Sequence, residues 1–458
     1  MTITISSVVS GGFCIGCGVC AVKSDAIRID WNSFGDKVAR IIRPLDEQTE
    51  IAISNVCPFS AAANETKIAE IIFPEIIYSD SNVGRYISAY IGYSEAFRTF
   101  GSSGGVITHI LAKLLRDGLV DAVLCVGPTD SCIAEYQVVV DEIGLKNCAT
   151  SFYYPVSMEA VIEFVRKTPG RYAITGIPCF HKALRLLRAT DTLINERIVF
   201  QAGIVCGQMK SAEYAEYLAR RCGKNSASDV TRAKFRVKNS TTSADNYRFQ
   251  AEWVVENQRH LSGSILAKDI GVNWAMSYFK PKACDYCDDV FAEVADFVAM
   301  DAWLPGHVSD PLGTSILMIR NHEVEELINA DIKSGALALD VCSADVIVQS
   351  QEAGLRHRRE GVRVRLAFNR IFGNKMPKKR VSSSFQSGLF ICIEMLLRVM
   401  LRRTSRGAFY LQRKVGNGLW LFNALMYGPH FLYRLFSAIK RRHNSSPSRK
   451  AESAYRLD

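Results

Sequence analysis

The chain has 458 residues, of which 48% are hydrophobic and 22% charged, and its formal net charge is +10. This length and composition exclude a disordered chain and predict a globular protein of about two or three domains. The N-terminus lacks a basic segment followed by an apolar one, so we expect no secretory signal and a cytoplasmic location. In a reducing compartment, clustered cysteines hold metal more often than they form disulfides, and this chain has fourteen cysteines.

The charge is divided unevenly along the chain. Residues 351–458 contain 23 Lys and Arg against 5 Asp and Glu, a net charge of +18, which leaves 33 against 41, or −8, for residues 1–350. A basic tail of this kind suits anionic lipid, an acidic partner or nucleic acid. Nucleic acid is the least favoured partner, because the basic residues are not interleaved with base-stacking aromatic residues.

Three cysteines near the N-terminus, Cys14, Cys17 and Cys20, have the C-x2-C-x2-C spacing of a bacterial ferredoxin. The position of the usual fourth cysteine holds Ser24, but Cys57 stands in a Cys-Pro pair further along the chain. A long loop closes at little extra entropic cost, so we predict that Cys57 completes the set. Four thiolates also suit structural zinc, but the close triple with a remote Cys-Pro pair favours a [4Fe-4S] cluster. Residues 1–80 are therefore predicted to form a ferredoxin-like module.

The central region, residues 81–350, alternates strand and helix patterns. The stretch GSSGGVITHILAKLLRDGLVDAVLCVG predicts a helix over 106–117, capped by Ser102 or Ser103 and closed by Gly118, and a strand over 121–126. The stretches RYAITGIPCFHKALRLLRA and RIVFQAGIVCGQMKS predict two more strand-to-turn steps. The expected fold class is mixed α/β, with a partly parallel, helix-covered sheet.

A second group of cysteines is scattered through this region. Cys179 and Cys206 each follow a predicted strand, and Cys284 with Cys287 form a CxxC pair. The carboxyl ends of parallel strands meet at one edge of a sheet, so the first two should face one crevice that the CxxC pair closes. Singly, each is compatible with a buried small hydrophobe, a dithiol or a zinc knuckle. Together they predict a second four-thiolate site.

The turn GSSGG before the 106–117 helix offers backbone amides, hydroxyls and the positive end of a helix dipole, which together favour phosphate. It is neither a Rossmann fingerprint nor a Walker loop, and such turns also serve as simple caps. Between two candidate clusters, it suggests a flavin that links one-electron centres to a two-electron acceptor.

Beyond residue 351 the chain is predicted to form a basic, helical tail. The runs GLFICIEMLLRVMLRR and GLWLFNALMYGPHFLYRLFSAIKRR are too often interrupted by polar residues to span a membrane. They fit amphipathic helices that pack on the body or make peripheral contact with a membrane. The polar end, residues 443–458, is expected to be disordered.

The order of the motifs CIGCGVC, VCPFS, SSGGVITHILAKLLRDGLVDAVLCVG, ITGIPCFHKALRLL, GIVCG, CDYCDD and MDAW resembles the beta-subunit family of coenzyme F420 hydrogenases and dehydrogenases. The resemblance covers roughly residues 10–310 and both domains of the family. It implies an iron–sulfur flavoprotein whose relatives pass electrons between clusters and FAD to coenzyme F420 or, in one branch, reduce a hydroxymethylated chlorophyll.

The resemblance also implies roles for individual residues. Ser102, Ser103, Gly104 and Gly105 match the flavin-binding turn, and Gly176 and Pro178 would line the same cavity. The cysteines that match the ligands of one or two clusters are Cys14, Cys17, Cys20 and Cys57, then Cys179, Cys206, Cys284 and Cys287.

This sequence departs from the family pattern at two positions. Ile177 replaces a threonine, and Met300 replaces a glycine that would let the backbone approach a cofactor. The motifs HRREGVRVRL and MPKKRV of the tail resemble a bacterial subgroup that occurs with enzymes of surface polysaccharide (exopolysaccharide) biosynthesis. In that setting the organic acceptor need not be coenzyme F420.

Candidate acid–base residues are few. His181, which follows Cys179 closely, could deliver a proton near the flavin, although a histidine at a helix start more often caps or is solvated. Asp301 and Trp303 could close over the cavity, with core packing an alternative for Trp303. The pair Tyr153 and Tyr154 could stack on a ring or pack in the core.

Two functions from different classes follow. The first is an oxidoreductase that receives electrons from a ferredoxin or a partner subunit and passes them through clusters and flavin to an organic acceptor. The second is a non-catalytic accessory or scaffold subunit of a membrane-associated polysaccharide assembly complex, with structural metal sites and the basic tail as its working surface.

Overall fold

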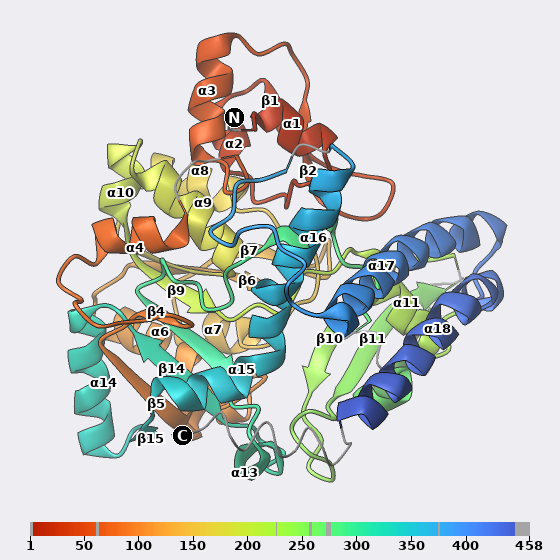
Figure 1. The fold of residues 1–458 in the computed structure, drawn as a ribbon. Helices are drawn as coiled ribbons and strands as arrows, with labels where there is room; N and C mark the ends of the chain where they lie inside the picture. The colour runs from red at the N-terminus through yellow and green to blue at the C-terminus, as the bar shows by residue number, and fades with distance from the viewer. Residues whose placement is uncertain are drawn as a thin grey trace.

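The computed structural model describes residues 3–60, 64–225, 227–255, 259–271, 276–373 and 376–444 (Figure 1). Most of the end that we expected to be disordered, residues 445–458, lies outside the described residues.

An eight-stranded mixed sheet forms the centre of the fold, with the order β15-β5-β14-β13-β9-β8-β6-β7. The neighbours β6 and β8, β8 and β9, and β9 and β13 are parallel, and the other pairs are antiparallel. This confirms the predicted partly parallel sheet. The strands are β5 (Ser88–Tyr93), β6 (Ala122–Gly127), β7 (Glu135–Val139), β8 (Tyr172–Gly176), β9 (Ile198–Ile204), β13 (Phe297–Asp301), β14 (Ser315–Ile319) and β15 (Ala338–Val341).

Helices cover both faces of this sheet. Successive residues of a strand point to opposite faces, and here both faces carry apolar side chains. Val123 packs in one apolar cluster and Leu124 in another. The cluster of Val123 includes α6 (Val106–Arg116) and α14 (His322–Ser334), and that of Leu124 includes α8 (Glu159–Lys167) and α9 (Pro178–Arg188). Shorter helices join these elements: α5 (Glu95–Arg98), α7 (Glu142–Cys148), α10 (Thr192–Arg197) and α13 (Pro305–Val308).

The start of α6 differs from our prediction. The helix begins at Val106, as expected, but its N-cap is Gly105, with φ +76° and no side-chain cap bond. The hydroxyl of Ser102 instead accepts from the Ser151 amide at 2.8 Å, and that of Ser103 donates to the Thr314 carbonyl at 2.9 Å. The serine cap was therefore wrong, because neighbouring segments engage both hydroxyls. The predicted strand after the helix is confirmed as β6, one residue later than expected.

The first part of the N-terminal region, from α1 to α3, lies at the top of Figure 1 and brings its cysteines together through short helices. The Asp46 side chain caps α3 by accepting from the Thr49 amide at 2.8 Å, and Cys57 is the C-cap of that helix. Contacts between α2 and α3 place Cys57 beside the earlier cysteines. The elements are α1 (Ile5–Ser10), α2 (Val19–Lys23), β1 (Ile27–Trp31), β2 (Lys37–Ile41), α3 (Glu47–Val56), α4 (Glu65–Ile72), β3 (Ser79–Asp80) and β4 (Gly84–Arg85).

A smaller antiparallel sheet stands beside the main one. It contains β10 (Val230–Val237), β11 (Arg248–Val255) and β12 (Arg259–Leu266), with α11 (Glu213–Arg221) packed against it. Two short elements follow, α12 (Ala267–Ile270) and the 3-10 helix η2 (Lys282–Tyr286).

The C-terminal region is helical, as predicted, and consists of α15 (Ala344–Arg358), α16 (Glu360–Ile371), α17 (Leu389–Val415) and α18 (Trp420–Asn444). Figure 1 shows α17 and α18 side by side at the right of the molecule. Their inner faces join the main apolar cluster, where the ring of Phe422 stacks on Phe279 at 5.9 Å. The tail thus packs on the body. In the described part of the chain, every helix is too short or too polar to cross a bilayer.

Much of the basic charge of the tail is used in this packing. Arg402 pairs with Asp285 at 2.7 Å, and Lys379 pairs with Asp288 at 3.2 Å. Arg406 pairs with Asp36 of the N-terminal region. The two aspartates 285 and 288 belong to the CxxC loop and are 1% exposed, so the acidic loop and the basic tail neutralise each other in the interior.

Candidate functional site

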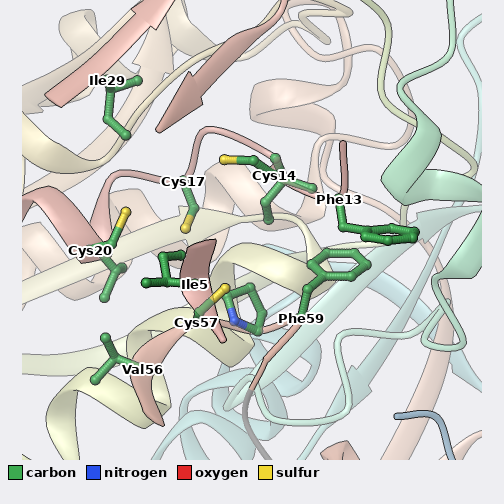
Figure 2. A pocket seen from close by; sticks show the side chains of 12 residues that line it. Ile5, Phe13, Cys14, Cys17, Cys20, Ile29, Val56, Cys57 and Phe59 are labelled. Atoms are coloured by element: carbon green, nitrogen blue, oxygen red, sulfur yellow. The ribbon is translucent and has the colours of Figure 1, made fainter. Parts of the chain in front are cut away.

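The first set of cysteines lines one small cavity (Figure 2). The four side chains surround a common space, with Phe13 and Phe59 to one side of it. The rest of the lining is apolar, and the lining residues are Ile5, Phe13, Cys14, Ile15, Cys17, Val19, Cys20, Ile29, Val56, Cys57, Pro58 and Phe59. The structure therefore brings Cys57 to the three N-terminal cysteines, as the Cys-Pro pair predicted.

Glycines shape the loop that carries these cysteines. Gly16 has φ +66°, in the left-handed region, and a Cβ there would lie 2.3 Å from the carbonyl oxygen of Lys37. The amide of Gly16 donates to the Cys14 sulfur at 3.4 Å, and that of Ala39 donates to it at 3.1 Å. Such N–H···S bonds stabilise negative charge on a ligating sulfur.

Burial controls the acidity of these thiols. It raises the pKa of Cys14 to about 11, and neighbouring Cys57 adds to the effect, although two backbone amides oppose it. Burial also raises the pKa values of Cys17 and Cys20 far above the ordinary thiol range. Several thiolates in one apolar cavity repel each other, so an enclosed cation would be needed to hold them in the ionised form.

The second set of cysteines lines another small cavity. Cys179 is in the first turn of α9, directly after β8, and Cys206 follows β9, so both lie at the carboxyl edge of parallel strands. The other two come from η2 and the residue after it. The lining residues are Ile15, Phe59, Pro178, Cys179, Cys206, Met209, Cys284, Cys287 and Arg358. The predicted crevice is thus formed, and the CxxC pair borders it.

The second cavity differs from the first because a cation, Arg358, is among its lining residues. The Met209 amide donates to the Cys284 sulfur at 3.4 Å. Burial raises the pKa of Cys206 to about 12, although the guanidinium of Arg358 acts against this increase. Ile15 and Phe59 border both cavities, so two side chains form a shared wall.

No group of three or more His, Cys, Asp or Glu side chains that could hold a metal ion is found among the described residues. The eight cysteines thus line two cavities, and their role as cluster ligands stays a prediction.

The predicted flavin turn, residues 101–105, is held by hydrogen bonds to its neighbours. The amide of Gly104 donates to the Ser315 hydroxyl at 3.0 Å. The amine of Lys238 donates to the Ser103 carbonyl at 2.8 Å and also to that of Arg98. Burial, with Arg98 and Arg236 nearby, lowers the pKa of Lys238 to about 8. The turn therefore has cations beside it, which suits a phosphate.

Two family descriptions match the chain. The coenzyme F420 hydrogenase/dehydrogenase beta subunit N-terminal domain matches residues 89–163, and the C-terminal domain of that subunit matches residues 170–344. Together they cover more than half of the chain. The chain belongs to the coenzyme F420 hydrogenase/dehydrogenase beta subunit family. It is therefore a member of an oxidoreductase family, which confirms the resemblance.

Individual relatives of this beta-subunit family are distant. The coenzyme F420-dependent sulfite reductase of Methanocaldococcus jannaschii is 24% identical over 340 residues, which are 72% of this chain and 48% of that protein. The chain thus spans about half the length of this curated relative. A chain from the F420-reducing [NiFe] hydrogenase complex of Methanosarcina barkeri is 15% identical, with a TM-score of 0.49, and the match covers 66% of this chain and 99% of that one.

The family motifs also single out Gly176, at the end of β8, and Pro178 and His181, in α9. Pro178 borders the second cysteine cavity, and a Cβ on Gly176 would lie 3.2 Å from the ring of His181. His181 is 1% exposed; its Nε2 donates to the Ala202 carbonyl at 3.0 Å, and the Gln201 amide donates to its Nδ1 at 2.9 Å. Burial lowers its pKa to about 4. The ring is thus held neutral by two hydrogen bonds to β9 and is neither a helix cap nor solvated.

The beta-subunit motif MDAW supplies an ion pair. Asp301 accepts two hydrogen bonds from Arg236, both at 2.8 Å, and this guanidinium also lies over the ring of Trp303 at 5.3 Å. Tyr153 contacts Phe235 edge-on at 5.5 Å, and Tyr154 contacts Trp31 at 5.9 Å. The aromatic rings of this region are thus engaged in packing.

Sequence reasoning missed three cations that the fold brings to these sites: Arg236, Lys238 and Arg358. Arg236 and Lys238 lie in β10 and directly after it, and no motif marks them. Arg358 lies beyond the residues that match the beta-subunit family, in a tail rich in arginine. The motif HRREGVRVRL includes this residue, but nothing in the spacing relates it to the cysteines.

Proposed function

We propose that the chain is an iron–sulfur flavoprotein oxidoreductase that passes electrons between two [4Fe-4S] clusters and a flavin, FAD, to an organic acceptor. The observation that carries this proposal is the pair of cavities, each lined by four cysteines and separated by a shared wall. A cubane cluster takes four cysteine ligands, so each cavity has the right donor set for one cluster. When bound, the clusters and the flavin would supply one-electron and two-electron chemistry, respectively.

The residues of the chain would bind these groups and exclude water from them. Cys14, Cys17, Cys20 and Cys57 would hold the first cluster, and Cys179, Cys206, Cys284 and Cys287 the second. The apolar lining of the first cavity keeps water from its sulfurs, and the amides of Gly16 and Ala39 stabilise charge on Cys14.

For the flavin, we propose the turn of Ser102, Ser103, Gly104 and Gly105 at the start of α6. The helix dipole and the amine of Lys238 favour a phosphate there, and Lys238 is already fixed by two carbonyls. His181 has no part in this proposal, because both of its ring nitrogens bond within the sheet.

We further propose a partner subunit or a ferredoxin as electron donor, because a relay of two clusters accepts one electron at a time. The acceptor is F420 or another organic molecule. A role in polysaccharide biosynthesis and a cytoplasmic location remain predictions from the sequence.

One further surface supports peripheral contact with a membrane. Helix α18 contains four Lys and Arg and no acidic residue, whereas Arg402 and Arg406 of α17 are paired with aspartates of the body. The exposed face of α18 is apolar and includes Trp420, Tyr427 and Phe431. An apolar stripe on a helix whose own charged residues are all basic complements an anionic bilayer. Sedimentation with vesicles that contain phosphatidylserine tests this: the F431E variant should bind them at least about tenfold more weakly, and equal binding would contradict it.

The main proposal is tested by purifying the full chain without oxygen and measuring iron, acid-labile sulfide, zinc and flavin in one sample. We expect about eight irons and one flavin per chain, since each cubane holds about four irons. A colourless protein that contains zinc and no flavin would overturn the proposal and support the accessory or scaffold function.

A further inference from the structure

Arg358 is the last residue of α15 and is 2% exposed. It is one of the lining residues of the second cavity, beside all four cysteines of that cavity. The C-terminal family match ends at residue 344, so this arginine is supplied by the tail.

The hydrogen bonds of Arg358 leave its charge unbalanced. Its Nη2 donates to the carbonyls of Cys206 and Gly207 at 2.6 and 2.8 Å, and its Nη1 donates to that of Asp289 at 3.3 Å. All three acceptors are neutral. Among the described residues no carboxylate forms an ion pair with Arg358, and its buried Nε has no hydrogen-bond acceptor. A cation buried without an anion is strongly unfavourable.

The cysteine sulfurs of the second cavity are the groups that could balance this charge. Four neutral thiols would not do so. Four thiolates around a cubane cluster would, because the complex carries a formal charge of two negative units when oxidised and three after it accepts one electron. Each added electron is therefore stabilised by the guanidinium, and the free Nε–H can donate to a cluster or cysteine sulfur.

The first cavity offers a matched contrast. Its lining, besides the four cysteines, consists of aliphatic, aromatic and proline residues without any cation. Electrons are thus added to similar ligand sets in two different electrostatic environments.

We infer that Arg358 is a positioning residue that raises the reduction potential of the cluster in the second cavity above that of the cluster in the first. This inference rests on the proposed function, because it requires both clusters. It assigns the C-terminal region a part in the direction of electron flow: electrons that enter at the first cavity move downhill to the second. One electron leaves the first cluster, which is oxidised, and the second is reduced by the same electron.

The test is a redox titration of the full-length holoprotein, followed by electron paramagnetic resonance. The C20S and C284S variants, which should each lose one cluster, assign the two signals. In the wild-type protein the second cluster should be reduced first. In R358Q, the equilibrium preference of the electron for the second cluster should fall at least tenfold, which corresponds to 59 mV for a one-electron couple. The potential of the first cluster serves as the internal control.

The R358K variant separates charge from geometry. It keeps a cation but lacks the planar fork, so its second-cluster potential should lie between those of the wild type and R358Q. Eight irons in R358Q with unchanged potentials, or an equal shift of both clusters, would overturn the inference and leave the proposed function intact. If R358Q does not retain the second cluster, the test is the order in which the two clusters of the wild-type protein are reduced. Reduction of the first cluster before the second would overturn the inference. Wild-type protein without iron in the second cavity would overturn both.

Discussion

The two cysteine-lined cavities use the same kind of residue but are assembled in different ways. The first is formed within residues 5–59, by α1, the cysteine loop with α2, β1 and the end of α3. The second draws on residues from position 15 to position 358, which come from the N-terminal region, two strand ends, the CxxC loop and the tail. Local assembly gives an apolar cavity, whereas long-range assembly brings in a buried cation. The comparison shows that two similar sets of cysteines can differ in electrostatic environment because different segments of the chain enclose them.

Removing one cysteine from each cavity gives the largest expected effect. C20S should lose the cluster of the first cavity and C284S that of the second, so each variant should retain about four irons. The measurement is iron and labile sulfide per chain in protein purified without oxygen. The C392S variant is the control, because Cys392 lies in α17 and borders neither cavity. Loss of all iron in both variants would show that the two cavities do not load independently.

Breaking an ion pair beneath the CxxC loop should affect the second cavity alone. The R402M variant leaves Asp285 buried with one fewer cation, and loss of one partner of a buried pair costs about 3–5 kcal/mol. We expect a lower thermal midpoint and loss of the second cluster first. R43M removes an exposed partner of Asp25 and should cost about 0.5 kcal/mol or less. Equal midpoints for the two variants would contradict the expectation.

A change at Gly16 should affect the first cavity alone. Gly16 and Gly118 share φ +66°, but only at Gly16 would a Cβ collide with a backbone oxygen, whereas Gly118 has open space around it. The G118A variant should lose about 1 kcal/mol through backbone strain, and G16A about 2 kcal/mol or more. Chemical denaturation compares the two, and iron analysis of G16A should show loss from the first cavity. If G118A is the less stable variant, the close approach to Lys37 is not what fixes the loop.

The smallest expected effect is on flavin binding at the flavin turn, which lines neither cavity. Burial lowers the pKa of Lys238 to about 8, so the free amine is charged below this pH and neutral above it. A bound phosphate favours the charged form, so FAD affinity should be constant below pH 8 and fall by up to about tenfold per pH unit above it. Fluorescence titration of flavin-depleted protein measures this.

The K238M variant should bind FAD more weakly and without this pH dependence. K234M, a change at an exposed lysine of β10, the strand that Lys238 directly follows, is the matched control and should behave as the wild type. Iron content should not change in either variant. An identical pH profile in wild type and K238M would exclude Lys238 from phosphate binding.

The sequence was sufficient where the signal is local or follows from topology. Cysteine spacing and one Cys-Pro pair predicted the first set, and the rule that strand ends share an edge predicted that Cys179 and Cys206 meet. The serine cap of α6 was wrong, because Gly105 begins the helix in a left-handed conformation. The position of Arg358 at the second cavity could not be predicted, because it depends on how α15 packs against a loop about 70 residues earlier.

The shared wall of Ile15 and Phe59 limits how the molecule can be rebuilt. Both side chains stand within two residues of a cysteine of the first set, yet they also close the second cavity. An exchange of residues 1–60 for an unrelated ferredoxin would therefore open the second cavity to solvent even if the new segment folded well. The N-terminal segment is thus not an interchangeable module, and changes to its two wall residues should be non-additive with changes in the central region.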